Sequence, residues 1–431
     1  MSDMTRIAIQ QMIENPSRAL APFKQLLAKT EAEQGVQAAY NLLGQWEVAA
    51  GKRRPTLAIY DHTFHLIGGG QKYGLTVAEA LQDLFDITII ANRPITHQHI
   101  RDWYHLNLDN CRIKVIEIPF YQESDSPHLD PARVTKKIPN PFHAVSLESG
   151  KYDFFINNSM NEMVYPLAPM SYLICHFPER RPKTYFYADR YQVIYNSEYT
   201  AHWIEKKWGF KPHKHIYPPV DMEVSDEAGE RRNLILSVAR FEVGGSKKQL
   251  EMIRAFSGMC KRDPAIAQHW TLVLAGGSQA DNPYLEKIRE MVKANPGVNI
   301  EIGVNIPIEQ LKDYYKQAKI FWHLCGLNQK DPALVEHFGM TICEAMQNRL
   351  APIVFDGGGQ REIVDQGVSG FRVNTLSELA QHTVRLIREP EHLTAISAAA
   401  YKKSKQFAID KFNSRVQEYF SEALDYYSLK N

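Results

Sequence analysis

Two glutamates eight positions apart, Glu336 and Glu344, stand in the stretch EHFGMTICE. On one continuous helix their side chains would point roughly 80° apart, and Gly339 disfavours an unbroken helix. We therefore expect Glu336 on a loop, a helix that opens at Gly339 and Met340, and Glu344 in its second turn. The start of such a helix attracts anions, phosphate above all. Two carboxylates beside an anion site predict a ligand that carries both hydroxyls and phosphates.

A second group of charged side chains lies in VARFEVGGSKKQ, at residues 238–249. A predicted strand ends at Arg240, and Ser246 is placed to cap a helix that carries Lys247 and Lys248. Arginine offers a planar fork and lysine a point charge, a combination that suits a diphosphate. A solvated basic helix end is the alternative. Lysines at a helix start oppose the macrodipole, however, so an anion should offset them.

Glycine-rich turns follow other predicted strands: Gly68, Gly69 and Gly70 in the stretch 61–74, Gly276 in LAGG, and DGGGQRE at 356–362. Glycine lets a backbone approach a ligand closely and can form an anion-binding nest. The first turn is neither a G-x-G-x-x-G fingerprint nor a P-loop, and a plain flexible turn explains it about equally well. Four strand-end loops rich in glycine or cations, spread over two units, together favour a ligand site.

His176, in ICHFP at a predicted strand end, is the histidine that we place near the site. A histidine whose hydrogen bonds are satisfied in the turn before Pro178 is an equal alternative. The sequence has no H-x-x-x-H or H-E-x-x-H spacing, and no D-x-D pair to hold a divalent cation. We therefore expect no metal and no resident cofactor.

The elements that must position these residues alternate between strand and helix from residue 56 onward. The first unit has the β-rich runs TLAIYDH, ITIIAN, IKVIEIP, YDFFINN, SYLICHF and QVIYNS. The second has LILSVA, WTLVLAGG, VNIEIG, KIFWHLC and APIVFD. Such alternation predicts an α/β fold with two parallel sheets, each covered on both faces. Ligands of these sheets bind at the carboxyl ends of the strands, where the residues above lie.

The expected organisation has four parts: a helical extension at 1–54, an N-terminal Rossmann-like domain at 55–222, a C-terminal one at 223–405, and a last helix at 406–431 that crosses back to the N-domain. Within the extension, the stretch from Ser17 to Gly51 predicts two helices. A cap packed on the first domain and a recruitment module both fit this extension.

The composition excludes several classes of protein. Lys plus Arg number 50 and Asp plus Glu 49, so nucleic acid is not expected as a partner. The five cysteines have no C-x-x-C spacing, which is typical of reduced cysteines in a cytoplasmic protein. The chain has no apolar run of membrane-spanning length, although peripheral contact with the inner membrane face is compatible with the sequence.

Taken together, these residues resemble glycosyltransferase family 4, retaining enzymes with two facing Rossmann-like domains, the GT-B fold. Glu336 and Glu344 match the family's E-x7-E motif, and SVARFEVGGSKKQ matches its strand–Arg–Phe–loop–Lys element. The glycine loop at 68–70 matches the N-terminal loop. The stretches NSEYTAHWIEKKWG, IYPPVD and CHFP are similar to the branch of cytosolic mannosyltransferases of lipid-linked oligosaccharide assembly. The resemblance covers about residues 56 to 405.

The resemblance implies two sets of site residues. The catalytic set is Arg240, Lys247, Glu336 and His176. The donor-binding set is Gly69, Gly70, Lys248, Gly276, Gly339, Met340, Thr341 and Glu344. In these roles Glu344 would bind the ribose of a nucleotide, and Arg240 and Lys247 would neutralise the diphosphate, with Lys248 as the fallback lysine. Glu336 would lie near the donor sugar.

The chain departs from the family in one respect. Many members carry a histidine in the N-domain after a strand such as YDFFINN, whereas Asn157, Asn158 and Ser159 occupy that neighbourhood here. Either an asparagine performs the polar role, or His176 reaches in from the neighbouring strand. The sequence leaves both alternatives open.

The implied function is a retaining, metal-independent glycosyltransferase of polysaccharide biosynthesis. It would move a sugar from a GDP- or UDP-sugar donor to a glycan, lipid-linked or other hydroxyl acceptor. One alternative is a catalytically degenerate GT-B protein that binds a sugar nucleotide or glycan as an assembly partner. A sugar-nucleotide epimerase on the same fold is another, against which the E-x7-E pairing argues.

Overall fold

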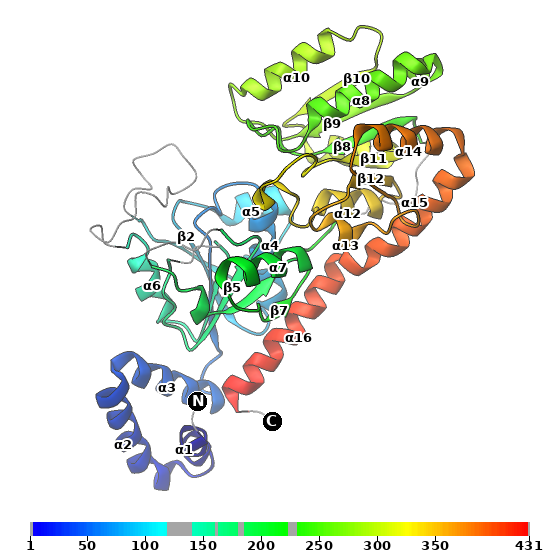
Figure 1. Ribbon diagram of the computed structural model, residues 1–431. Coiled ribbons are helices and arrows are strands. Elements are labelled where there is room, and N and C mark those ends of the chain that lie inside the picture. The colour runs from blue at the N-terminus through cyan, green and yellow to red at the C-terminus, as the bar shows by residue number, and fades with distance from the viewer. Residues whose placement is uncertain (1–2, 119–139, 160–162, 180–184, 223–230, 430–431) are drawn as a thin grey trace. The chain divides into compact units, whose positions relative to one another are not determined.

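The computed structural model describes residues 3–118, 140–159, 163–179, 185–222 and 231–429. The chain divides into two compact units (Figure 1). The first comprises residues 1–196, 200–217 and 412–431, and the second comprises 197–199 and 218–411. The aromatic and polar stretch PFYQESDSPHLD, which the sequence offers as a candidate for the acceptor site, begins at residue 119 and lies outside the described residues.

The first unit is built on a seven-stranded parallel sheet with the order β3-β2-β1-β4-β5-β6-β7. Its strands are β1 (Thr56–Tyr60), β2 (Asp86–Ala91), β3 (Arg112–Val115), β4 (Phe154–Asn157), β5 (Met170–Cys175), β6 (Gln192–Tyr195) and β7 (Lys214–His215). The first six were predicted. The two-residue β7 was not, because a strand that short carries no periodic signal.

Helices cover both faces of this sheet. They are α4 (Gly69–Leu81), α5 (His97–Tyr104), α6 (His143–Ser149), α7 (Glu198–Trp208) and the last helix, α16 (Ile409–Ser428), with a short 3₁₀ turn, η2 (Ala188–Arg190). Leu57 and Ile59 of β1 enter one core with α4 and α16. Ala58 and Tyr60 enter the opposite core with α6 and α7. Burial on both faces explains why the strands read as continuous apolar runs.

The second unit repeats the plan with six parallel strands in the order β10-β9-β8-β11-β12-β13. The strands are β8 (Leu234–Val238), β9 (Thr271–Gly276), β10 (Ile300–Val304), β11 (Ile320–His323), β12 (Ala351–Phe355) and β13 (Phe371–Val373). The helices are α8 (Gln249–Arg262), α9 (Pro264–His269), α10 (Pro283–Lys293), α11 (Ile308–Gln317), α12 (Met340–Gln347), α13 (Gln360–Ile363), α14 (Leu376–Arg388) and α15 (Pro390–Ser404), with 3₁₀ turns η3 (Pro332–Leu334) and η4 (Lys405–Phe407). Two parallel sheets with covering helices confirm the predicted fold class.

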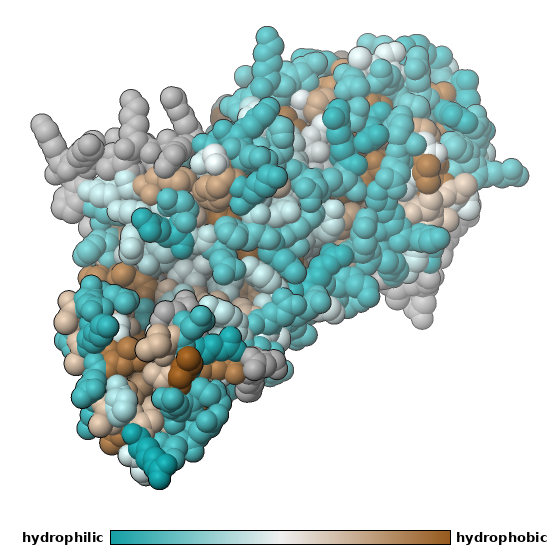
Figure 2. All heavy atoms as spheres, turned by 60° about the horizontal axis from the view of Figure 1, so that its bottom comes forward, coloured by the Kyte–Doolittle hydropathy of each residue, from teal (hydrophilic) through white to brown (hydrophobic). Residues whose placement is uncertain are grey.

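The extension forms three helices, α1 (Asp3–Glu14), α2 (Pro16–Gln34) and α3 (Val36–Ala49). The two helices predicted from Ser17 onward are α2 and α3, and α1 was not predicted. A small core of their own joins them, centred on Ile9, Phe23 and Leu42. Apolar side chains also gather on the outer face of the extension, which is turned forward in Figure 2. The exposed large ones are Met4, Ile7, Leu20, Val36, Tyr40 and Leu43.

One buried carboxylate, that of Asp153, ties the extension to the first unit. The Arg53 guanidinium, just after α3, donates to both Asp153 oxygens at 2.5 and 2.8 Å. The Thr56 amide at the start of β1 donates to it at 2.8 Å, and the Tyr427 hydroxyl of α16 also at 2.8 Å. The extension is therefore packed on the first unit, as the cap interpretation expected. The predicted roles of the domains as acceptor and donor domains stay predictions.

Candidate active site

Parallel strands place the candidate residues of the second unit at one edge of its sheet. Arg240 follows the carboxyl end of β8, His323 is the last residue of β11, and Gly276 is the last residue of β9. These three strands belong to the same parallel sheet. Residues from distant parts of the sequence therefore meet where ligands of such sheets bind.

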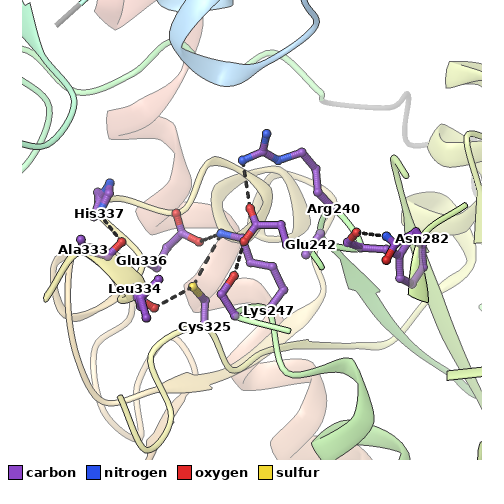
Figure 3. Close-up of polar contacts among 12 residues, drawn as sticks. Arg240, Glu242, Lys247, Asn282, Cys325, Ala333, Leu334, Glu336 and His337 are labelled. Carbon is purple, nitrogen blue, oxygen red and sulfur yellow. Dashed lines mark hydrogen bonds and ion pairs between the residues drawn. The ribbon is translucent and has the colours of Figure 1, made fainter. Parts of the chain in front are cut away.

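Lys247 and Glu336 form the centre of this edge, as Figure 3 shows. The Lys247 ammonium lies 2.8 Å from Glu336 Oε2 and 3.6 Å from the Cys325 sulfur. His323 Nε2 lies 2.9 Å from the same Glu336 oxygen. Both side chains of the ion pair are only 18% exposed. Glu336 is thus held between a lysine and a histidine in a largely dry environment.

The ion pair keeps both of its members charged. Burial favours the neutral form of Glu336, but the Lys247 ammonium and the His323 hydrogen bond outweigh it and hold the pKa of Glu336 well below its usual range. Burial also works against the Lys247 ammonium, and the Glu336 carboxylate outweighs it, so the pKa of Lys247 is raised. Burial raises the pKa of Cys325 to about 12, which keeps that sulfur a thiol.

Arg240 makes a separate pair with Glu242. Its guanidinium donates to Glu242 at 2.9 Å, and the Arg240 side chain is 72% exposed. Ser246 also donates to Glu242. The expectation that Ser246 caps the helix is therefore wrong: α8 begins three residues later, after Lys248 in the left-handed conformation at φ 64°. Glu242 is thus the anion beside Arg240, and Glu336 is the anion beside Lys247.

The structure separates the two neighbouring lysines. The Lys247 side chain points to Glu336 on the loop that precedes α12. Lys248 is buried and its ammonium lies 4.0 Å from Glu251, one turn along its own helix. Lys247 is thus the lysine that faces the carboxylate of the motif, while the donor-binding role predicted for Lys248 stays a prediction.

The helix that carries Glu344 begins where the sequence placed it. Gly339 precedes α12 in the left-handed conformation at φ 117°, and Met340 is the first helical residue. Thr341 is the second residue of α12. In the described part of the chain, no side chain caps the start of this helix. Glu344 is 9% exposed, and its Oε2 accepts a hydrogen bond from the Tyr315 hydroxyl at 2.7 Å. Burial and the Glu344 carboxylate raise the pKa of Tyr315 well above its usual value, so this hydroxyl is a donor.

Two of the glycine turns pack closely against backbone segments that carry site residues. A Cβ on Gly276 would lie 2.0 Å from the Ala239 carbonyl oxygen, so glycine lets β9 end against the segment that carries Arg240. The Gly359 amide donates to the Glu336 carbonyl at 2.9 Å. A Cβ on Gly358, at φ 60°, would lie 2.1 Å from that same oxygen. Glycine at these positions therefore sets the position of the loop that bears Glu336.

The candidate residues of the first unit gather at the carboxyl edge of its own sheet. Gly69 and Gly70 open α4 rather than forming a separate loop. His176 Nε2 lies 3.3 Å from Asn158 Oδ1, and the Asn158 amide donates to the Gly70 carbonyl at 3.0 Å and to Asp61 at 2.6 Å. The two alternatives that the sequence left open, an asparagine or His176, therefore belong to one hydrogen-bonded group.

Four residues near these sites were missed: Glu242, Tyr315, His323 and Asp61. His323 and Asp61 each carried a signal, since each is a polar residue at the end of an apolar strand run. Tyr315 carried none, because its contact depends on how α11 and α12 pack. A cavity of about 370 Å³ in the first unit is lined by residues at the amino ends of β5 and β6, so it lies at the other edge of that sheet from His176.

Within the described ranges, no group of three or more His, Cys, Asp or Glu side chains is arranged to hold a metal ion. No helix in the same ranges is both long and apolar enough to cross a membrane.

Comparison with known sequences identifies the family of the second unit. Residues 222–403 match the family described as Glycosyl transferases group 1. The second unit belongs to this family. The group 1 match contains Glu344 as well as Arg240, Lys247 and Glu336, which lie at the carboxyl edge of the second sheet.

The curated relatives of this chain include proteins whose names specify different substrates. The GDP-Man:Man(3)GlcNAc(2)-PP-Dol alpha-1,2-mannosyltransferase of Dictyostelium discoideum is 25% identical over 229 residues, 50% of this chain and 43% of that protein. A sucrose synthase of Thermosynechococcus vestitus is 30% identical over 196 residues, 41% of this chain and 22% of that protein. The chain thus matches less than half the length of either relative.

Solved glycosyltransferase structures share the fold of most of the chain. A glycosyltransferase from Rickettsia africae has a TM-score of 0.64 at 15% identity, covering 88% of this chain and 100% of that one. HepE from Anabaena, solved in complex with UDP and glucose, has a TM-score of 0.63 at 16% identity, covering 85% of this chain and 100% of that one. The chain therefore has the GT-B fold that the sequence predicted.

Proposed function

We propose that this chain is a retaining glycosyltransferase that moves a sugar from a nucleotide-diphosphate donor to a hydroxyl of an acceptor. The observation that carries the proposal is the largely buried Lys247–Glu336 pair beside Arg240 at the carboxyl edge of the group 1 unit. A largely buried cation whose charge is offset by one carboxylate suits a ligand that brings its own negative charge.

The residues of the second unit divide the work as follows. Arg240 and Lys247 offset the charge of the diphosphate as its bond to the sugar breaks, so the proposal requires no metal for this step. Fixed donors aimed at developing charge contribute about 3 to 4 kcal/mol each in known enzymes. The start of α12, at Gly339, Met340 and Thr341, offers backbone N–H groups to the phosphates. Glu344, held by Tyr315, takes the ribose hydroxyls.

Glu336 lies where the donor sugar would follow the phosphates. When the diphosphate engages Lys247, the Glu336 carboxylate retains its hydrogen bond to His323. It can then accept hydrogen bonds from sugar hydroxyls or stabilise positive charge on the sugar. His176, Gly69 and Gly70 would serve the same reaction from the first unit.

For the donor we propose a GDP- or UDP-sugar. The mannosyltransferase relatives use GDP-mannose according to their names, and HepE was solved with UDP-glucose. For the acceptor we propose a glycan, free or lipid-linked, as in polysaccharide biosynthesis, because the mannosyltransferase names specify a glycan on a dolichol diphosphate. A lipid-linked acceptor would bring the enzyme into peripheral contact with the cytoplasmic face of a membrane.

The test begins with the thermal stability of the purified protein in GDP, UDP, ADP and CMP and their sugar conjugates, since a ligand of the native state raises its melting temperature. We expect a shift with one diphosphate family, followed by sugar transfer with that donor. Lys247→Met should lose the transfer activity at least about a hundredfold. The matched control is Lys261→Met, at the far end of α8.

Two results would contradict the proposal. Transfer at the wild-type rate by Lys247→Met would show that Lys247 does not offset the charge of the diphosphate. Tight nucleotide binding without transfer or hydrolysis on any donor and acceptor would favour an assembly partner instead of an enzyme.

A further inference from the structure

A line of hydrogen bonds crosses three adjacent strand ends in the first unit. Asp61 follows β1, Asn158 follows β4 and His176 follows β5, and these strands are neighbours in the sheet. Asn158 Nδ2 donates to Asp61 Oδ2 at 2.6 Å, and Asn158 Oδ1 lies 3.3 Å from His176 Nε2. Asp61 and Asn158 are 2% and 1% exposed, so water does not compete for these bonds.

The surroundings decide which way the Asn158 amide faces. A carboxylate only accepts hydrogen bonds, and so does a backbone carbonyl. The Asn158 nitrogen meets one of each, Asp61 Oδ2 at 2.6 Å and the Gly70 oxygen at 3.0 Å. The reversed amide would place its oxygen against both acceptors. The network therefore turns the NH₂ group toward Asp61 and the oxygen toward His176.

The orientation of Asn158 in turn decides which nitrogen of His176 carries the proton. The Asn158 oxygen accepts, so His176 Nε2 must donate. Burial lowers the pKa of His176 to about 4, against the opposing effect of Asp61, so the ring is neutral at neutral pH. A neutral imidazole has one N–H and one acceptor nitrogen, which leaves Nδ1 as the acceptor. Within the described parts of the chain, no residue is hydrogen-bonded to this Nδ1.

The ring is also held in place by packing. Tyr73 meets it edge to face, with ring centroids 5.3 Å apart. A Cβ on Gly70 would lie 3.3 Å from Nε2, so glycine allows the first turn of α4 to approach the ring closely. The Thr200 hydroxyl donates to the His176 backbone carbonyl at 3.0 Å and does not touch the ring nitrogens.

We propose that Asp61 and Asn158 are positioning residues that hold His176 in the Nε2–H tautomer, so that Nδ1 accepts a hydrogen bond from a sugar hydroxyl. The hydroxyl belongs either to the donor sugar or to the acceptor glycan, and this part rests on the proposed function. The tautomer itself does not depend on it. In this arrangement Asp61 orients the Asn158 amide, Asn158 fixes which ring nitrogen of His176 carries the proton, and His176 binds the sugar.

The tautomer is measured directly by nitrogen NMR of protein carrying isotope-labelled histidine, with the His176 signal assigned from its loss in His176→Asn. We expect the wild-type ring to be neutral with its proton on Nε2. Asn158→Leu should produce a mixture or the other tautomer, because the acceptor is gone. Thr200→Val, which removes a bond to the same residue but not to its ring, should leave the tautomer unchanged.

The opposite result overturns the proposal. A wild-type His176 that carries its proton on Nδ1, or that is charged at neutral pH, would contradict the proposal whether or not the protein transfers sugar. Failure of the proposed function is a separate outcome, in which the tautomer is as expected but no donor is hydrolysed or transferred.

Kinetics then separate positioning from a merely structural role. Asp61→Asn and Asn158→Leu should each slow transfer about tenfold to a hundredfold. Asn158→Leu added to His176→Asn should slow it no further, because residues that act through one another are not additive. If the hydroxyl is the donor's, hydrolysis without acceptor falls too; if it is the acceptor's, only the acceptor KM rises. Independent, multiplicative losses would contradict the proposal.

Discussion

The Lys247 ammonium lies 2.8 Å from the Glu336 carboxylate, although 89 positions separate the two residues in the chain. Each side chain is 18% exposed, so neither charge has enough water to stand alone. A negatively charged ligand that binds Lys247 must therefore compete with Glu336, and His323 is the partner that Glu336 keeps.

Replacing Glu336 by Gln should impair transfer while preserving the fold. The amide keeps a hydrogen-bond acceptor for Lys247 but no charge to attract it or to stabilise the sugar. We expect initial transfer rates to fall about a hundredfold, the scale of one lost charge-stabilising group. Glu309→Gln, which alters an exposed pair with Lys312 on α11, is the control. Equal rates for Glu336→Gln and wild type would show that Glu336 takes no part in the reaction.

Removing the Tyr315 hydroxyl should weaken both stability and nucleotide binding. Tyr315→Phe removes the hydroxyl that donates to buried Glu344 at 2.7 Å, and the loss of a hydrogen bond to a charged group is worth about 1 to 3 kcal/mol. We expect a lower melting temperature and a higher Kd for the nucleoside diphosphate. The neighbouring Tyr314→Phe removes a hydroxyl 3.3 Å from Glu301 and only partly buried, and should change neither quantity much. Equal nucleotide Kd values for Tyr315→Phe and Tyr314→Phe would show that Glu344 does not bind the nucleotide.

Adding a methyl group at Gly359 should displace Glu336 without touching a ligand. Its Cβ would lie 2.3 Å from the His337 carbonyl oxygen, closer than any real contact, so the loop must move. We expect Gly359→Ala to lose most transfer activity and some stability. Gly244→Ala, where no atom lies within 4 Å of the added carbon, should be tolerated by both measures. A fully active Gly359→Ala would mean that the Glu336 loop need not be held in place.

His176 should make the first unit less stable in mild acid. Burial lowers its pKa in the folded protein from 6.5 to about 4, so between these values the unfolded chain binds the proton and the folded one does not. The contribution of His176 to stability is full above 6.5 and is lost as the pH falls toward 4, by at most about 3 kcal/mol.

The measurement compares melting temperatures of wild type and His176→Asn across that pH window, so that all other titrating groups cancel. The wild type should lose more stability than the variant on acidification. Parallel curves would mean that the imidazole is accessible to protons in the folded state.

Local sequence patterns were enough to predict the alternation of strands and helices, most of the strands, and the helix that carries Glu344. Gly339 dictated the start of α12, because few other residues adopt φ 117°, and hence the place of Glu344. The choice between Lys247 and Lys248 was harder, since it depends on the left-handed backbone of Lys248. The partners Tyr315 and His323 were out of reach, because packing between distant elements creates their contacts with Glu344 and Glu336.

Asp153 makes the helical extension an integral part of the first unit. Its single carboxylate receives hydrogen bonds from Arg53, Thr56 and Tyr427, which belong to the extension, the first strand and the last helix. Loosening any one of the three removes a hydrogen bond from a buried charge and weakens the hold on the other two. A protease acting on the native protein should therefore find these three segments opening as one cooperative block.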